Sequence, residues 1–228
     1  MYSNDLSSFF VSVISDSPKN IFSNLDTFVN CKMGGLHFDV MDGTFVPRLG
    51  LHPELLSELR KASGLFIEAH MMLSNPSKFV EAFAEAGASR LLFHIETKDD
   101  LGFLIKKTRA LGLEVGLVLN PNTRVTDAID FLPQIDSVML MAIQPGIPRH
   151  PFIDSTYLKL SKLTELVKSM NLELDVQIDG GVTFSNAERL LRDGATTLIC
   201  GSGTIFAPSD SIKSNIDRLS EISYLSRL

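Results

Sequence analysis

The stretch that organises the chain reads Leu36-His37-Phe38-Asp39-Val40-Met41-Asp42-Gly43. Its apolar residues favour a β-strand, and Asp42-Gly43 is a turn signal at the carboxyl end. Alternate residues of a strand share one face, so His37, Asp39 and Met41 would point the same way. Inside a closed parallel sheet the carboxylate would need compensation, because a buried unpaired carboxylate is unfavourable. A divalent metal ion is the most economical candidate, although the pattern His-x-Asp also occurs by chance.

Similar apolar runs recur along the chain, and a segment with helical spacing follows each of them. The expected strands cover residues 9–14, 36–43, 65–71, 90–94, 114–119, 137–142, 172–178 and 196–200. The expected helices cover residues 21–29, 54–61, 76–86, 99–111, a segment after 120–123, 152–170, 184–193 and 211–224. Pro53 suits the first turn of the second helix, and Gly87 and Gly112 suit helix ends.

Eight strand–helix units with nearly continuous apolar strands predict a parallel sheet covered by helices. Eight is the count of a (β/α)8 TIM barrel, so we expect one α/β domain of this kind over residues 1–228. An open, doubly wound sheet is the alternative. It is disfavoured because no Gly-x-Gly-x-x-Gly motif follows the first strand.

Composition limits the classes of partner and the compartment. The chain has 228 residues, 44% of them hydrophobic, and a formal net charge of −6 without a Lys/Arg-rich run, so we expect neither a nucleic-acid nor a membrane partner. Residues 1–5 lack the features of a signal peptide, and no apolar run has membrane-spanning length. Cys31 and Cys200 are too few for a disulfide framework, which favours the cytoplasm, and we expect both to act as small hydrophobes.

In barrels of this kind the chemistry lies at the carboxyl ends of the strands. Those ends hold Ser12, His37, Asp39, Met41, His70, Met72, Met141 and Asp179. Two histidines and two aspartates suit Zn²⁺ as first candidate, with Fe²⁺, Mn²⁺ and Co²⁺ as alternatives, better than Mg²⁺ or Ca²⁺. The plain alternatives are a hydrogen-bonded core histidine at 70, packing methionines and a turn at Asp179. Recurrence at the same place in successive units favours a site.

Small residues also follow the last two strands. Gly180-Gly181 follows the seventh strand, and Gly201-Ser202-Gly203 follows the eighth and is expected to open a short helical run. Backbone N–H groups at such places bind anions, and loops after strands seven and eight commonly hold phosphate in these barrels. Ordinary glycine turns are the alternative.

Taken together, these residues resemble the ribulose-phosphate 3-epimerase family over nearly the full length. The matching motifs are residues 37–43 with 45–47, 70–72 with 75–76, 86–88 with 93–96, 115–117 with 120–121, Met141 with 145–146, 179–182, and 194–195 with 201–202 and 205–206. The resemblance implies one divalent metal ion bound by His37, Asp39, His70 and Asp179. It also implies that Asp39 and Asp179 are the acid and base.

The resemblance further implies how a substrate would be held. Ser12 and His70 would contact the substrate, Met41, Met72 and Met141 would cap the reacting carbon, and Gly146 would lie in a closing loop. Gly180, Gly181, Gly201 and Ser202 would bind its phosphate. Relatives of this kind often assemble, so we expect a homo-oligomer.

Inversion at C3 of a 2-ketose phosphate explains these residue types. One carboxylate removes a proton from one face, and the opposite carboxylic acid delivers a proton to the other. Negative charge develops on the C2 oxygen of the enediolate, and a divalent ion there would stabilise it by several kcal/mol. Apolar methionines would exclude water.

Three departures from the family pattern surround the expected substrate position. Residues 145–151 read Pro-Gly-Ile-Pro-Arg-His-Pro where Pro-Gly-Phe-Gly-Gly-Gln is usual, residues 48–50 read Arg-Leu-Gly, and residues 11–14 read Val-Ser-Val-Ile. Pro148 would stiffen the loop, and Arg149 would either reach a phosphate or remain solvated.

The leading prediction is a metal-dependent 3-epimerase of D-ribulose 5-phosphate and D-xylulose 5-phosphate. The alternatives are a 3-epimerase of another sugar phosphate, such as D-allulose 6-phosphate, and a non-catalytic sugar-phosphate-binding protein. A decarboxylase or aldolase is disfavoured because no lysine ends a strand where that chemistry would need one.

Overall fold

Eight parallel strands close into a barrel in the computed structural model, which describes residues 6–17, 19–147 and 150–228. Each strand pairs with the next along the chain, and β8 pairs with β1. The strands are β1 (Leu6–Ser12), β2 (Met33–Met41), β3 (Ile67–Met72), β4 (Arg90–His94), β5 (Glu114–Leu119), β6 (Ser137–Met141), β7 (Asp175–Asp179) and β8 (Thr197–Cys200). The expected (β/α)8 fold is confirmed.

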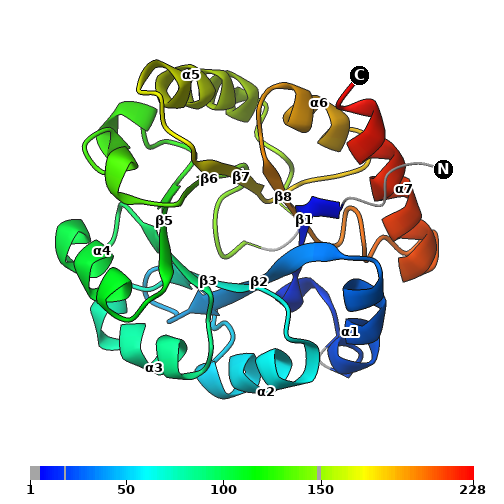
Figure 1. Cartoon of the computed structure of the whole chain (residues 1–228), viewed down its shortest axis with the longest axis horizontal. Coiled ribbons are helices and arrows are strands. Elements are labelled where there is room, and N and C mark those ends of the chain that lie inside the picture. Colours follow the sequence, from blue (N-terminus) through cyan, green and yellow to red (C-terminus); the bar gives the residue numbers. More distant parts are fainter. Residues whose placement is uncertain (1–5, 18, 148–149) are drawn as a thin grey trace.

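The helices form a ring outside the barrel, as Figure 1 shows. They are α1 (Ile21–Asn30), α2 (Pro53–Ser63), α3 (Val80–Glu85), α4 (Leu101–Ala110), α5 (Ser155–Ser169), α6 (Ala187–Arg192) and α7 (Ile212–Leu225). Local sequence explains their ends. Pro53 begins α2, Gly64 ends it in the left-handed conformation, and the Asp100 side chain accepts a hydrogen bond from the Phe103 N–H at the start of α4.

The connection from β5 to β6 differs from the prediction. Where a helix was expected after residues 120–123, the chain forms two 3-10 turns, η3 (Val125–Ala128) and η4 (Leu132–Gln134). Pro133 lacks a backbone donor, and the Asp127 side chain accepts from the Arg124 N–H, so both residues disfavour a continuous α-helix.

Three further segments also differ from the prediction. The first strand ends at Ser12 and continues as a 3-10 turn, η1 (Val13–Ser15), rather than as a strand to residue 14. The helix expected at 76–86 is a 3-10 turn, η2 (Pro76–Lys78), followed by α3. Residues 201–206 form hydrogen-bonded turns, with the N–H groups of Thr204 and Phe206 donating to the Gly201 carbonyl, so the helical run expected at Gly203 was wrong.

The alternation of β2 divides its side chains between two cores. Leu36, Phe38 and Val40 belong to the large cluster between the strands and the helices, whereas His37 and Asp39 face the barrel interior. A second, smaller apolar cluster fills the interior. Its buried members are Phe10, Leu92, Val118, Met139, Met141 and Ile199. Within the described residues, no helix has the length and apolar character needed to cross a membrane.

Candidate metal and acid–base site

The four histidines and aspartates expected at one site do meet, inside the barrel near the carboxyl ends of three strands. His37 and Asp39 lie on β2, His70 on β3 and Asp179 at the end of β7. The β2–β3 register places Asp39 directly beside His70. Both imidazoles are fully buried, and the carboxylates of Asp39 and Asp179 keep side-chain exposures of 9% and 15%. Only the carboxylates are therefore open to the barrel mouth.

Distances within this cluster are short. Nε2 of His37 lies 3.2 Å from Nδ1 of His70 and 3.4 Å from Oδ1 of Asp39. Nδ1 of His70 lies 3.4 Å from the same Asp39 oxygen and 3.7 Å from Oδ2 of Asp179. The four potential ligand atoms all lie within 4.8 Å of one another.

The donor set fits one divalent ion. Ligands of a four-coordinate Zn²⁺ with bonds of about 2.0–2.1 Å would stand about 3.3 Å apart, close to the separations seen here. Two imidazole nitrogens and two carboxylate oxygens match the preference of Zn²⁺ and similar ions. The cluster is therefore able to bind a metal ion.

The pKa directions of these groups point to the same need for positive charge. Burial alone would lower the pKa of His37. The charge and hydrogen bond of Asp39, the hydrogen bond of Glu68 and the charge of Asp179 outweigh it and raise that pKa well above its ordinary value. Burial would raise the pKa of Asp39, yet His37 and His70 hold it below its ordinary value. The pKa of Asp179 is raised, first by burial and then by the Asp39 charge. A divalent cation would supply this positive charge, which would favour the ionised form of Asp179 and replace the extra proton on His37.

Sequence reasoning missed a buried ion group directly beneath His37. Glu68 on β3 is fully buried, and its Oε1 lies 2.8 Å from Nδ1 of His37. Its Oε2 accepts from Nη1 of Arg90 at 3.2 Å and from Nε2 of Gln177 at 2.9 Å. Arg90 also pairs with Asp175 and Glu114, both at 2.7 Å. The signal was available in the strand periodicity, because residues 68 and 70 share a face.

A second supporting group lies beside His70. Nε2 of His94, on β4, lies 2.8 Å from Nε2 of His70, and the two rings stack at a centroid distance of 4.9 Å. Nδ1 of His94 lies 3.3 Å from Oε2 of Glu96. Burial lowers the pKa of His94 to about 4, so this ring is neutral near pH 7. The resemblance had marked residues 93–96 as a motif without giving them a role.

The methionines expected to cap the substrate separate into two groups. Met41 and Met72 pack together with Val46 in a small cluster that Phe45 also contacts. Met141 belongs to the interior apolar cluster and pairs in register with Asp179. All three are buried, which also agrees with ordinary packing.

The residues expected to bind phosphate follow β7 and β8, and Ser12, which was expected to contact the substrate, ends β1. The Oγ atoms of Ser12 and Ser15 lie 3.0 Å apart, and a Cβ added to Gly201 would lie 2.6 Å from the Ser15 oxygen. Ser202 is exposed. Ser12, Ser15 and Gly201 are therefore neighbours, and Ser15 is a member that the sequence did not single out.

Gly180 and Gly181 follow Asp179 with φ angles of +97° and +65°. A Cβ on Gly180 would lie 2.3 Å from Ile143, and one on Gly181 would lie 3.0 Å from Phe152. Glycine at both positions thus allows the loops after β6 and β7 to approach closely.

Loops that border the barrel mouth are also in place. Gly146 has a φ of +75°, and its Cα faces Val46. Arg48 lies in the segment that returns along β2, where the N–H of Gly50 donates to the Met41 carbonyl. Pro148 and Arg149 lie outside the described residues, so the expected role of Arg149 remains a prediction from the sequence.

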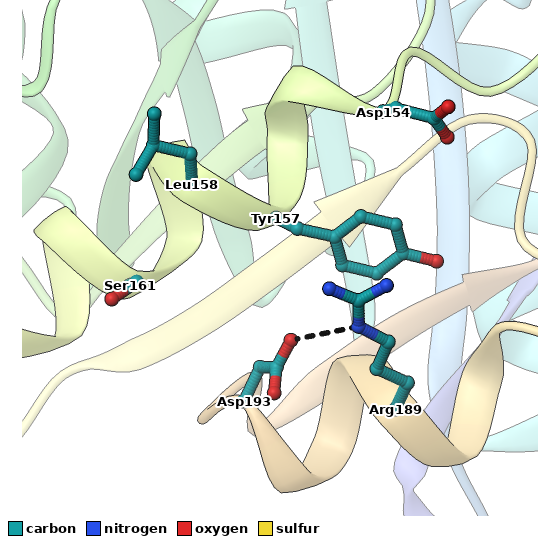
Figure 2. Close-up of a pocket in the computed structure, with 6 residues that line it drawn as sticks. All are labelled: Asp154, Tyr157, Leu158, Ser161, Arg189 and Asp193. Carbon is teal, nitrogen blue, oxygen red and sulfur yellow. Dashed lines mark ion pairs between the residues drawn. The ribbon is translucent and has the colours of Figure 1, made fainter.

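An open pocket of about 790 Å³ lies elsewhere, on the outer surface between α5 and α6 (Figure 2). Its guanidinium, from Arg189, lies over the Tyr157 ring at 3.7 Å and pairs with Asp193 at 3.4 Å. These charged groups already have partners, and no residue of the histidine–aspartate cluster lines the pocket, so it is not the candidate catalytic site.

Comparison with known families and proteins agrees with this geometry. The sequence model described as "Ribulose-phosphate 3 epimerase family" matches residues 9–206. A ribulose-phosphate 3-epimerase of Aquifex aeolicus (strain VF5) is 37% identical over 175 residues, which cover 77% of this chain and 78% of that protein. The protein named "Ribulose-phosphate 3-epimerase, cytoplasmic isoform" of Oryza sativa subsp. japonica is 32% identical over 203 residues, which cover 87% of each.

Similar solved structures support the fold alone, because their sequences are distant. The 3-hexulose-6-phosphate synthase of Salmonella typhimurium has a TM-score of 0.70 at 14% identity, covering 96% of this chain and 99% of that one. A mutant tryptophan synthase α-subunit of Pyrococcus furiosus has a TM-score of 0.68 at 14% identity, with full coverage of both chains.

Proposed function

The chain belongs to the ribulose-phosphate 3-epimerase family of carbohydrate isomerases, and we propose that it is a metal-dependent 3-epimerase of a ketose phosphate. D-ribulose 5-phosphate and D-xylulose 5-phosphate are the proposed substrate pair. The observation that supports this most strongly is that Asp39 and Asp179 reach one cluster from the separate strands β2 and β7.

Two carboxyl groups reaching one cluster from separate strands suit the two proton transfers of an epimerisation. In the proposed reaction, the carboxylate of one aspartate takes the C3 proton from one face of the ketose. The other aspartate, protonated at its carboxyl oxygen, returns a proton to the opposite face. The reverse reaction exchanges their roles. His37 and His70, both fully buried, do not open to the barrel mouth, so we assign them to metal binding and not to proton transfer.

His37, Asp39, His70 and Asp179 would hold the cation, for which Zn²⁺ is our first candidate and Fe²⁺, Mn²⁺ and Co²⁺ are alternatives. When bound, a divalent cation supplies positive charge for the substrate oxygen on which negative charge develops. Met41 and Met72 would exclude water from the reacting carbon, since both are apolar and packed at the barrel mouth. Ser12 would contact the substrate, and Gly180, Gly181, Gly201 and Ser202 would bind the phosphate.

A second candidate substrate is a six-carbon ketose phosphate such as D-allulose 6-phosphate. The motivation is the loop at residues 145–151, where Pro148 and Arg149 replace two flexible glycines usual in the family. A changed closing loop would change the enclosed volume without altering the acid pair. Comparing kcat/KM on pentulose and hexulose phosphates would decide between the two substrates.

The decisive experiment is proton NMR of D-ribulose 5-phosphate in D₂O with protein loaded with Zn²⁺. We expect D-xylulose 5-phosphate to appear with deuterium at C3, because the returning proton would come from a carboxyl group that exchanges with solvent. Conversion with retention of the original C3 proton would contradict the two-carboxylate route. Binding of the sugar phosphate without exchange at C3 would instead indicate a non-catalytic binding protein.

A further inference from the structure

Both imidazoles that face the cluster are held through their other ring nitrogen. We propose that Glu68, and His94 together with Glu96, are positioning residues that keep His37 and His70 in the tautomers required for binding a divalent cation. This inference rests on the proposed metal site, and it concerns the residues around the ligands, not the ligands themselves.

Inside the barrel, Glu68 supports His37 at the ring nitrogen that does not face the cluster. Glu68 is fully buried, and each of its neighbours within hydrogen-bond distance can donate: Nδ1 of His37 at 2.8 Å, Nη1 of Arg90 at 3.2 Å and Nε2 of Gln177 at 2.9 Å. A carboxylate only accepts hydrogen bonds, so the neutral, metal-binding form of His37 must carry its proton on Nδ1. In that form the lone pair of Nε2 points at Asp39 and His70.

Glu96 supports His70 indirectly, through the ring of His94. Glu96 accepts from the backbone N–H of Asn120 at 3.0 Å and from the hydroxyl of Thr123, and its other oxygen lies 3.3 Å from Nδ1 of His94. Because this carboxylate accepts, Nδ1 of His94 carries the proton, and Nε2 of His94 is left as an acceptor.

The accepting nitrogen of His94 in turn determines which ring nitrogen of His70 carries the proton. Its Nε2 lies 2.8 Å from the accepting Nε2 of His94, so Nε2 of His70 donates and Nδ1 keeps its lone pair. That Nδ1 atom is the one that faces Asp39 and Asp179. The Phe45 ring lies 4.8 Å from the His94 ring and helps to shield these hydrogen bonds from water.

Two separate chains of hydrogen bonds therefore lead to the same result, with one lone pair from each imidazole aimed into the cluster. Carboxylates that bond the far nitrogen of a metal-binding histidine fix its tautomer and orientation, and their loss typically weakens metal binding 10- to 100-fold. Glutamine cannot replace Glu68 well. Donors face both of its oxygens, and an amide can accept on only one side.

Zn²⁺ affinity of the full chain, measured by calorimetric titration, tests this inference. We expect Glu68→Gln to raise the Kd about 10- to 100-fold, and Glu96→Gln to raise it by up to about tenfold because it acts through His94. Glu114→Gln is the matched control, since Glu114 binds the same Arg90 at 2.7 Å but contacts neither imidazole of the cluster. Its Kd should stay within about twofold of the parent value.

The tautomers themselves give a second readout, which a merely structural role would not affect. In the Zn²⁺-loaded protein, nitrogen-15 NMR of the imidazoles should place ring protons on Nδ1 of His37, Nε2 of His70 and Nδ1 of His94. Glu96→Gln, which changes a partly exposed side chain, keeps the test available if Glu68→Gln does not fold. A ring proton on Nε2 of His37, or equal Zn²⁺ affinity in all variants, would overturn the inference.

These outcomes are separate from the fate of the proposed function. If the parent chain binds Zn²⁺ and epimerises the substrate while the variants bind Zn²⁺ equally well, only the positioning role fails. If the parent chain binds no Zn²⁺, Fe²⁺, Mn²⁺ or Co²⁺ at all, the proposed metal site fails, and the positioning role fails with it.

Discussion

A Cβ added to Gly146 would lie 2.5 Å from the Cβ of Val46, so the loop after β6 packs directly against the loop after β2. Val46 in turn packs with Met41 and Met72, beside the candidate acid pair. This contact connects the loop expected to close over the substrate with the wall of the barrel mouth. Its consequence is that residue 146 has almost no room for a side chain.

Replacing Gly146 by alanine should therefore impair catalysis more than folding. The added methyl group would push the two loops apart, and we expect kcat/KM for the ketose phosphate to fall at least tenfold while Zn²⁺ affinity is unchanged. Gly112→Ala is the matched control, because Gly112 has a similar φ of +77° but nothing within 4 Å of its added Cβ. Both variants should lose about 1 kcal/mol of stability from the left-handed backbone. Equal activities would show that the Val46 contact does not matter.

Removing the proposed metal ion should lower both activity and thermal stability. The four ligand atoms of the cluster come from β2, β3 and β7, so a bound cation would connect strands from two sides of the barrel. A ligand at 100 times its Kd stabilises the folded state by about 2.7 kcal/mol. Treatment with a chelator should reduce the Tm by several degrees, and added Zn²⁺ should restore it. Asp39→Asn should reduce this Zn²⁺-dependent shift, and a full shift in that variant would argue against Asp39 as a ligand.

Breaking the Arg90–Glu68 pair should strongly destabilise the fold. The side chains of Arg90 and Glu68 are 8% and 0% exposed, and the charges of Glu68 and Asp175 raise the pKa of Arg90 despite burial, which alone would lower it. Arg90→Met would leave a buried carboxylate without its cation, which costs about 3–5 kcal/mol.

Arg109→Met provides the comparison in a urea-unfolding experiment. Arg109 pairs with Asp136 at 2.7 Å, but 42% of its side chain is exposed, so its loss should cost no more than about 1 kcal/mol. Similar losses in both variants would mean that Arg90→Met does not leave Glu68 as an uncompensated buried charge.

The barrel and the clustering of its two histidines and two aspartates were predictable because both follow from strand periodicity and strand ends. Alternation on β2 assigned His37 and Asp39 to one face, and the position of His70 and Asp179 at strand ends brought them to the same place. The start of β2 was not predictable in this way, because Gly34 and Gly35 are poor strand formers in isolation. Their role depends on tertiary packing, since a Cβ on either residue would lie within 3.0 Å of the Phe10 ring.

Spacing places Glu68 on the same strand face as His70, but it could not predict the partners of Glu68. The hydrogen bond from Gln177 to Glu68 joins positions 109 residues apart, and only barrel closure brings them together. The helix expected after residues 120–123 did not form because two local effects, a proline and a side chain bonded to the backbone, outweighed the apolar spacing.

Asp179→Asn tests the proposed division of labour between the two carboxyl groups. Asparagine keeps the shape and one oxygen ligand of Asp179 but cannot take up or release a proton, so we expect the interconversion of the two epimers to fall at least about 10²- to 10⁴-fold at saturating Zn²⁺. Because Asp39 would remain, one of the two epimers should still exchange its C3 proton for deuterium without net conversion, and NMR would detect this directly. Asp193→Asn, on the outer surface (Figure 2), should retain full activity and serves as the control. A variant that interconverts the epimers at the parent rate would remove Asp179 from proton transfer. Exchange of both epimers without conversion would instead show that Asp39 alone reaches both faces.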